Sequence, residues 1–202
     1  MVRSILLVAA ASTLAACWRA EVPRSAADTS VTAAASAPTA AMASYTATAT
    51  AEFGGGPAIS PRDVSNMIEA QGPQRTVAAL DPDGEKTRWT SVMGGIATGQ
   101  AAWLALATPL EPGTENASYA DLNTALKAAM VVNPSGVLAI MNEANPNLST
   151  DSICRPAGYE MEAAWSAAYY DALTPAVESV TTPSLASVRS ACLEILRARL
   201  PS

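Results

Sequence analysis

The chain has 202 residues, a formal net charge of -6 and a hydrophobic fraction of 50%, but alanine alone accounts for 44 residues. It contains no histidine, which excludes Ser-His-Asp and Cys-His nucleophilic sites and histidine-ligated metal centres, because each needs an imidazole. The 18 acidic residues outnumber the 12 basic ones. This balance argues against a nucleic-acid partner, since phosphate binding requires clustered lysine and arginine.

Residues 1–16 are typical of an export signal. One positive charge, at Arg3, precedes an apolar run over residues 5–16, which is shorter than the about 20 apolar residues of a membrane span and fits the apolar core of a signal peptide. The run ends in Leu14, Ala15, Ala16 and Cys17. This ending resembles the lipobox of bacterial lipoproteins, and the alternative is an ordinary cleavage site with a cysteine beside it by chance.

The lipobox resemblance implies that Cys17 becomes the acylated N-terminus of the mature chain. Several acyl chains on one cysteine exceed the two signals that a stable membrane anchor needs, since each buried methylene contributes about 0.8 kcal/mol. Lipoproteins that carry aspartate after the cysteine tend to stay in the inner membrane, whereas this chain has Trp18. We therefore expect an outer-membrane lipoprotein that faces the periplasm or the cell surface.

Residues 17–58 comprise the lipidated cysteine and a predicted tether. Between residues 19 and 58, 30 of 40 residues are Ala, Ser, Thr, Pro or Gly, and the few apolar ones follow no helical or strand period. Such a composition cannot bury enough apolar surface to offset the entropy of ordering. We expect a disordered tether that ends in Gly54, Gly55, Gly56 and Pro57.

Residues 59–202 have a usual size for one folded domain. Capping residues and apolar stripes at spacings of three and four predict successive helices. These begin after Ser60, at Pro73, around Trp89, around Trp103, at Ser118, after Asn133, around Trp165 and after Thr182. Pro109, followed by Pro112 with Gly113, is expected to end the helix around Trp103, and Pro175 is expected to end the helix around Trp165. No stretch alternates convincingly with period two, so the sequence predicts an all-α fold.

Three pairs of predicted helices follow one another across very short breaks, at Gly72, Gly99 and Asn133. Short connections make antiparallel neighbours. The expected architecture is a compact bundle of short helices. Stacked helix pairs, as in HEAT or tetratricopeptide solenoids, are the alternative, although the breaks are unevenly spaced and no sequence repeat is visible.

Cys154 and Cys192 remain once Cys17 is assigned to lipid. An even number of cysteines in an oxidising compartment favours a disulfide, which would staple the segment around residue 154 to the last helix. A redox pair is the alternative. The cysteines lack C-x-x-C spacing, however, and no histidine is available to activate a thiolate.

Candidate catalytic groups are few, so we expect a protein that is not an enzyme and that needs no metal or cofactor. Glu143, Glu160 and Glu162 are the carboxylates considered for glycosidase-type acid and base chemistry. Glu160 and Glu162 point to different faces of a helix at this spacing. Thr124 and Lys127 have the spacing of a nucleophile and its lysine base, but they lack the accompanying motifs and are interpreted as a surface pair.

Two sets of residues are candidate contacts with a partner. Tyr169 takes the apolar stripe of its helix, so Tyr170 is expected to turn partly outward, as a contact aromatic would. Asp81, Asp83 and Glu85 do not fit a calcium loop, because no glutamate stands at its twelfth position. They are interpreted as a solvated acidic turn, with a docking surface for a cationic partner as the sharper hypothesis.

A further set of residues resembles the spine of an uncharacterised group of exported proteobacterial proteins. It covers roughly residues 94–140 and comprises Gly95, Ile96, Ala97, Thr98, Gly99, Trp103, Leu104, Ala105, Leu106, Ala107, Leu110, Pro112, Gly113, Thr114, Asn133, Pro134, Val137 and Leu138. The resemblance implies an exported helical domain and carries over no functional residue.

The leading hypothesis is a lipid-anchored binding protein of the cell envelope. It is attached to the membrane through acyl chains on Cys17 and holds a protein partner, with an inhibitor or immunity protein against a basic enzyme as a special case. The alternatives are an envelope hydrolase that uses carboxylates and a structural or assembly accessory lipoprotein.

Overall fold

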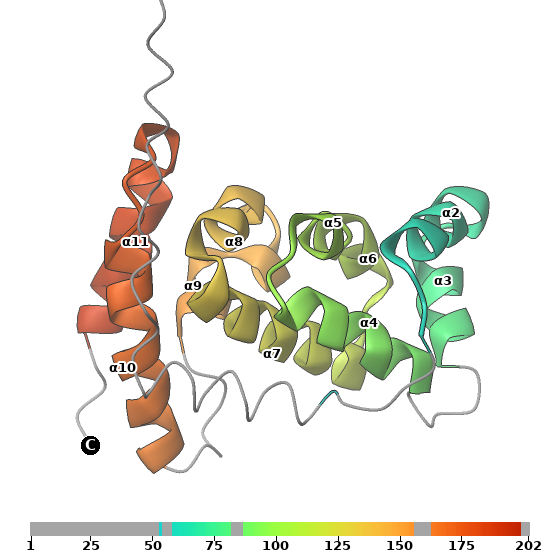
Figure 1. Ribbon diagram of the computed structural model, residues 1–202, viewed down its shortest axis with the longest axis horizontal. Coiled ribbons are helices and arrows are strands. Elements are labelled where there is room, and N and C mark those ends of the chain that lie inside the picture. Colours follow the sequence, from blue (N-terminus) through green and yellow to red (C-terminus); the bar gives the residue numbers. More distant parts are fainter. Residues whose placement is uncertain (1–52, 54–57, 82–86, 156–162, 199–202) are drawn as a thin grey trace, which may run out of the picture. The chain divides into compact units, whose positions relative to one another are not determined.

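A computed structural model describes residue 53 and residues 58–81, 87–155 and 163–198 (Figure 1). Within these ranges every regular element is a helix and none is a strand, which confirms the predicted all-α fold. The predicted signal segment, Cys17 and the predicted tether, apart from Phe53 and Ala58, lie outside the described residues. A search of the described helices finds none that combines the length and the apolar character of a membrane span.

The first two helices begin and end where their capping residues predict. α2 (Pro61–Gln71) starts after Ser60, whose hydroxyl accepts the N–H of Asp63 while the Asp63 carboxylate accepts the N–H of Ser60. This reciprocal pair is a capping box. α3 (Pro73–Leu80) follows after Gly72 alone, and its proline takes the first position, where a missing N–H breaks no helical bond.

The region predicted as one helix around Trp103 is broken into short pieces. α4 (Thr87–Ala97) is followed by α5 (Ala101–Leu104), α6 (Ala107–Leu110) and the 3-10 helix η1 (Glu111–Gly113). Pro109 does not end a helix, because it lies inside α6, and the helical run ends at Gly113 of η1, which together with Pro112 is the other predicted stop. Within the first turn of a helix the N–H groups have no intrahelical partner, so a proline there costs no hydrogen bond.

α7 (Asn116–Val132) is the longest helix of the described ranges, and it begins earlier than predicted. The N-cap is Glu115, and Ser118 is the third helical residue, whose hydroxyl accepts the N–H of Glu115. The acidic residue and the hydroxyl thus exchange the positions that a capping box usually gives them. α8 (Pro134–Ile140) starts after Asn133, whose side chain accepts the N–H of Gly136, as predicted.

The C-terminal part contains η2 (Pro146–Leu148), α9 (Thr150–Cys154), α10 (Ala163–Glu178), η3 (Pro183–Leu185) and α11 (Ala186–Arg197). Pro175 was predicted to end α10, but the helix continues for one further turn. Ala176 and Val177 of this turn are buried, as is Val180 just after the helix. Their burial outweighs the one helical hydrogen bond that a proline removes.

The helices from α2 to α8 pack as successive pairs. α2 contacts α3, α4 contacts α5, and α7 contacts α8, while adjacent pairs meet through α3 with α4, α4 with α7 and α5 with α8 (Figure 1). The described helices therefore form the predicted bundle of short helices, and within it this contact order is that of stacked helix pairs. α10 and α11 lie side by side, and they close the core by packing on α7 and on α9, respectively.

The predicted disulfide between Cys154 of α9 and Cys192 of α11 is confirmed. Both residues are fully buried. The two cysteines are 38 residues apart, and on the loop-entropy model a closed loop of this length stabilises the fold by about 4 kcal/mol. The bond holds α9 in place, since a helix of five residues is too short to be stable by itself.

The core extends further toward the N-terminus than the predicted domain boundary at residue 59. Phe53, the only phenylalanine of the chain, is 7% exposed and belongs to the core. It lies against Gly94 of α4, where an added Cβ would be 3.2 Å from the Phe53 carbonyl oxygen. The prediction of a tether is therefore wrong at Phe53, because one aromatic side chain buries a large area even among small residues.

Several residues of the proteobacterial resemblance have packing roles in the fold. Gly95 lets the ring of Trp103 lie directly on α4, since a Cβ at this position would be 2.4 Å from two ring carbons. The Asn133 amide donates a hydrogen bond to the Gly99 carbonyl over 2.8 Å. These contacts join the end of α4 to α5 and α8, so packing accounts for these residues.

Candidate functional site between α7 and α9

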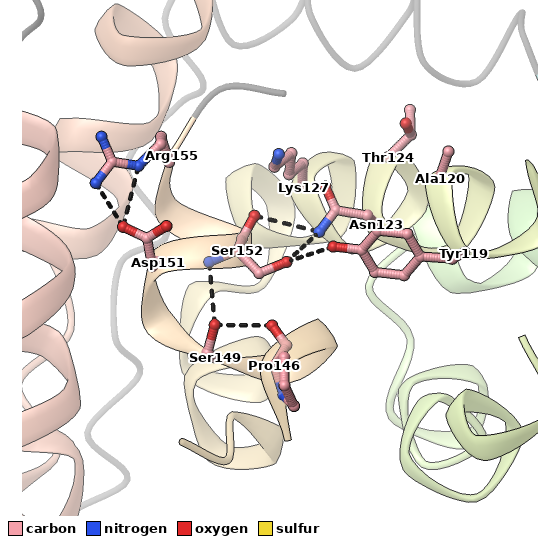
Figure 2. A pocket seen from close by; sticks show the side chains of 10 residues that line it. All are labelled: Tyr119, Ala120, Asn123, Thr124, Lys127, Pro146, Ser149, Asp151, Ser152 and Arg155. Carbon is pink, nitrogen blue, oxygen red and sulfur yellow. Dashed lines mark hydrogen bonds and ion pairs between the residues drawn. The ribbon is translucent and has the colours of Figure 1, made fainter. Parts of the chain in front are cut away.

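A cavity of about 520 Å³ lies between α7 and the segment formed by η2 and α9 (Figure 2). We call it the α7–α9 cavity. It is lined by Tyr119, Ala120, Asn123, Thr124, Lys127, Pro146, Ser149, Asp151, Ser152 and Arg155. A volume of this size lies within the range of small-molecule sites.

One wall of the cavity is a polar stripe on α7. Tyr119, Asn123 and Lys127 are spaced by four residues, so they lie above one another on a single helix face. The neighbouring faces of α7 carry buried apolar residues that pack on α4, α8 and α10. The stripe is thus the face of α7 that is left for α9, and Asn123 and Lys127 are buried in it.

The opposite wall is built by the start of α9. The hydroxyl of Ser149 caps this helix by accepting the N–H of Ser152 at 3.2 Å. The Ser152 hydroxyl is joined to the Tyr119 hydroxyl at 3.0 Å and accepts a hydrogen bond from the Asn123 amide at 2.9 Å. The same amide reaches the Ser152 carbonyl at 3.2 Å. This network, visible in Figure 2, fixes α9 against α7.

Lys127 is the most unusual group of the cavity. Its side chain is only 2% exposed, which corrects the interpretation of Thr124 and Lys127 as a surface pair. Burial lowers the pKa of Lys127 from 10.5 to about 8, and the nearby Asp151 carboxylate opposes this effect. Among the described residues, its ammonium makes no hydrogen bond or ion pair with a protein group, and Figure 2 draws none.

Asp151 and Arg155 form an ion pair at the edge of the cavity. The Nε and Nη2 atoms of Arg155 donate to the same Asp151 oxygen over 3.0 and 2.5 Å. This hydrogen bonding is the main reason why the pKa of Asp151 is lowered. Both side chains are exposed, so the pair adds little stability, but it neutralises two of the three charges that line the cavity.

Of the three carboxylates considered for acid and base chemistry, Glu143 alone is described, because Glu160 and Glu162 lie outside the described residues. Glu143 is exposed and accepts hydrogen bonds from the N–H and the hydroxyl of Thr150. These bonds lower its pKa. Glu143 therefore fixes the first residue of α9, and a lowered pKa makes it a poor proton donor near neutral pH.

A buried carboxylate also positions this wall, at a residue that the sequence would place on a solvated acidic surface. Glu111 of η1 is 7% exposed, and its oxygens accept hydrogen bonds from the amides of Asn145, at 2.5 Å, and of Asn147. The three residues tie η1 to η2, which leads directly into α9. They act as a structural latch beside the cavity.

The candidate contact residues do not gather at this cavity. Tyr170 is 8% exposed, so the expectation that it turns outward is wrong. α10 is covered by both α7 and α11, and a helix with two covered faces buries consecutive residues. Tyr170 packs edge-on against Tyr169, with ring centroids 6.1 Å apart. Asp81 is partly exposed at the end of α3, and Asp83 and Glu85 lie outside the described residues.

Comparisons with protein families, curated proteins and solved structures give no match for this chain. A helical fold by itself does not specify a function, so function has to be inferred from the site. In the described part of the chain, no three acidic or cysteine side chains cluster in a way that could hold a metal ion. What the α7–α9 cavity offers instead is one buried cation among hydroxyl and amide groups.

A signal for this site was present in the sequence. Lys127 interrupts the apolar run Ala125–Val132. Apolar runs are usually buried, so a lysine within one is a candidate for a buried charge. Its four-residue spacing from Asn123 and Tyr119 adds polar groups on the same face. The missing information was the identity of the segment opposite this face, because α9 is more than 20 residues away along the chain.

Proposed function

We propose that this chain is a lipid-anchored binding protein of the bacterial cell envelope. In this proposal Cys17 carries the membrane anchor after removal of residues 1–16, and the helical domain holds a ligand in the α7–α9 cavity. The observation that carries the binding role is the position of Lys127, a buried cation that faces a cavity lined by polar side chains.

The hydrogen bonds of the cavity support binding over hydrolysis. Asp151, which lines the cavity, and Glu143, which is hydrogen-bonded to the neighbouring Thr150, have lowered pKa values, whereas a general acid needs a pKa close to the working pH. The partners of the Ser152 hydroxyl are Tyr119 and Asn123, and neither is a base that would activate it near neutral pH. These groups suit the task of holding and orienting a ligand.

A protein partner fits the same proposal at the surface of the domain. The net charge of -6 favours a cationic partner, so an inhibitor or immunity protein that shields the cell from a basic secreted enzyme is the special case that we propose to test first. An outer-membrane anchor with a tether before the domain would allow such a protein to meet its partner in the periplasm or at the cell surface.

The anchor is tested by metabolic labelling with radioactive palmitate. We expect the wild-type chain to incorporate label and to sediment with outer membranes, and we expect Cys17→Ser to lose both properties. The matched control replaces Cys154 and Cys192 together, which removes the other two cysteines and their disulfide but leaves the lipobox intact. Equal labelling of Cys17→Ser and the wild type would contradict the lipoprotein assignment.

The binding role is tested by thermal unfolding of the full mature chain with and without an envelope extract. We expect the extract to raise the Tm of the wild type, since a ligand that binds the native state stabilises it. Ala120→Trp should fill the cavity from an exposed position and abolish the rise, whereas Ala139→Trp, at an exposed position of α8 outside the cavity, should keep it. Progressive consumption of the bound molecule would contradict a binding role and favour an enzyme.

A further inference from the structure

We propose that the α7–α9 cavity binds a small ligand through a carboxylate group, with the ammonium of Lys127 as its counter-charge. This inference rests on the proposed binding function and names the class of ligand that the same site would take. It depends on three features of the cavity: a buried cation without a partner, a charge balance of one positive unit, and walls that are fixed before a ligand arrives.

The first feature is the unsatisfied ammonium. Lys127 is 2% exposed, and its three N–H donors make no hydrogen bond or ion pair to the part of the protein that the structure describes. Among the described residues, Arg189 Nε is a polar side-chain atom that is fully enclosed by protein and has no hydrogen-bond partner, but the Lys127 nitrogen is not such an atom. The nitrogen is therefore open to the cavity, where a bound acceptor can reach it.

The second feature is the charge balance. Three charged side chains line the cavity, and Arg155 places two nitrogen atoms on one oxygen of Asp151. Asp151 also acts on Lys127 from a distance, but it forms its ion pair with Arg155. The three charges leave one positive unit, which matches a carboxylate. A phosphate dianion would need additional positive charge at the site.

The third feature is the rigidity of the walls. Ser152 joins Tyr119 and Asn123, and the Tyr169 hydroxyl donates to the Ile153 carbonyl over 2.6 Å. The next residue, Cys154, is bonded to α11. α9 is therefore held from both sides, so a ligand does not have to order it on binding, and less affinity is lost to ordering.

The test uses the two lysines of the chain, Lys86 and Lys127. The full mature chain is prepared in detergent micelles with ¹³C at lysine Cε, and the two NMR signals are assigned with Lys127→Met. Acetate is the carboxylate probe, acetamide is its uncharged isostere, and inorganic phosphate, a mixture of monoanion and dianion near neutral pH, is the more highly charged probe. All titrations are run near neutral pH at constant ionic strength.

We expect acetate to shift the Lys127 signal to saturation and to raise the pKa of this lysine, because a bound carboxylate stabilises the ammonium. Acetamide and phosphate should bind at least about tenfold more weakly, as expected when a charge-assisted hydrogen bond is lost or a second charge is left uncompensated. Ala120→Trp should retain the Lys127 signal and abolish its response, while Ala139→Trp should retain both.

Three results would overturn the inference: an acetate response of Lys127 that does not saturate, an equal response of Lys86, or tighter binding of phosphate than of acetate. The two proposals can fail separately. If acetate fails but the envelope extract still stabilises the chain through the cavity, only the carboxylate class is wrong. If acetate binds but the extract has no effect, only the proposed envelope ligand is refuted.

Discussion

Replacement of Lys127 by methionine tests whether the α7–α9 cavity really contains an uncompensated buried charge. Methionine has a similar length and an unbranched, flexible side chain, so it fills the space of the lysine stem without the ammonium. Most substitutions in a core destabilise a protein. We expect Lys127→Met to do the opposite near neutral pH, because a buried charge without a partner is costly.

The magnitude and the pH dependence follow from the pKa of Lys127. A fall from 10.5 to about 8 corresponds to about 3 kcal/mol, at about 1.4 kcal/mol per pH unit. Below about pH 8 both the folded and the unfolded chain hold the proton, so the folded chain bears the full cost. Between about pH 8 and 10.5 the unfolded chain binds more protons than the folded one, and the stability of the wild type therefore rises with pH.

Urea unfolding followed by circular dichroism, at several pH values between about 7 and 10, measures both effects. We expect Lys127→Met to be more stable than the wild type by about 3 kcal/mol near pH 7, and the difference to shrink as the pH approaches 10.5. Other titrating groups are common to both proteins and cancel in this comparison. Lys86→Met measures the general effect of removing a lysine and is subtracted.

Two outcomes would refute this reasoning. If Lys127→Met is less stable than the wild type near neutral pH, the ammonium is compensated inside the fold and has no need of a ligand. If the difference between the two proteins does not change with pH, the pKa of Lys127 is not depressed. Either result would remove the observation on which the proposed binding site depends.

Three further predictions concern the scaffold. Phe53→Ala should lower the free energy of unfolding by about 3 kcal/mol because Phe53 is a core residue. Truncation of the exposed Val132 to alanine should change it by no more than about 0.5 kcal/mol. Equal effects of the two substitutions in urea unfolding would mean that Phe53 is not part of the core. Joint replacement of Cys154 and Cys192 by serine should cost about 4 kcal/mol, and a double variant with the wild-type Tm would contradict the proposed fixing of α9. Gly95→Ala should cost about 1–3 kcal/mol through the clash with Trp103, and this cost should fall in a Trp103→Ala background, so additive effects in the double-mutant cycle would argue against the contact.

The candidate site was only partly predictable from the sequence. The spacing of Tyr119, Asn123 and Lys127 places them on one face of a helix, and this could be derived from the chain alone. The depth of burial could not, because it depends on α9, a short helix held by the disulfide and by hydrogen bonds from α7 and α10. The predicted outward orientation of Tyr170 was wrong for the same reason, since two neighbouring helices cover α10.

The sequence by itself determined the all-α fold, the limits of α2, the start of α3, the cap of α8 and the pairing of Cys154 with Cys192. Caps and stops act over three or four residues, and two cysteines left after Cys17 is assigned allow a single pairing. Only the tertiary structure decided that Phe53 enters the core, that Pro175 stays within α10 and that Lys127 faces a cavity. These outcomes depend on the helices that cover each face, and contacts between segments distant in sequence leave no local pattern.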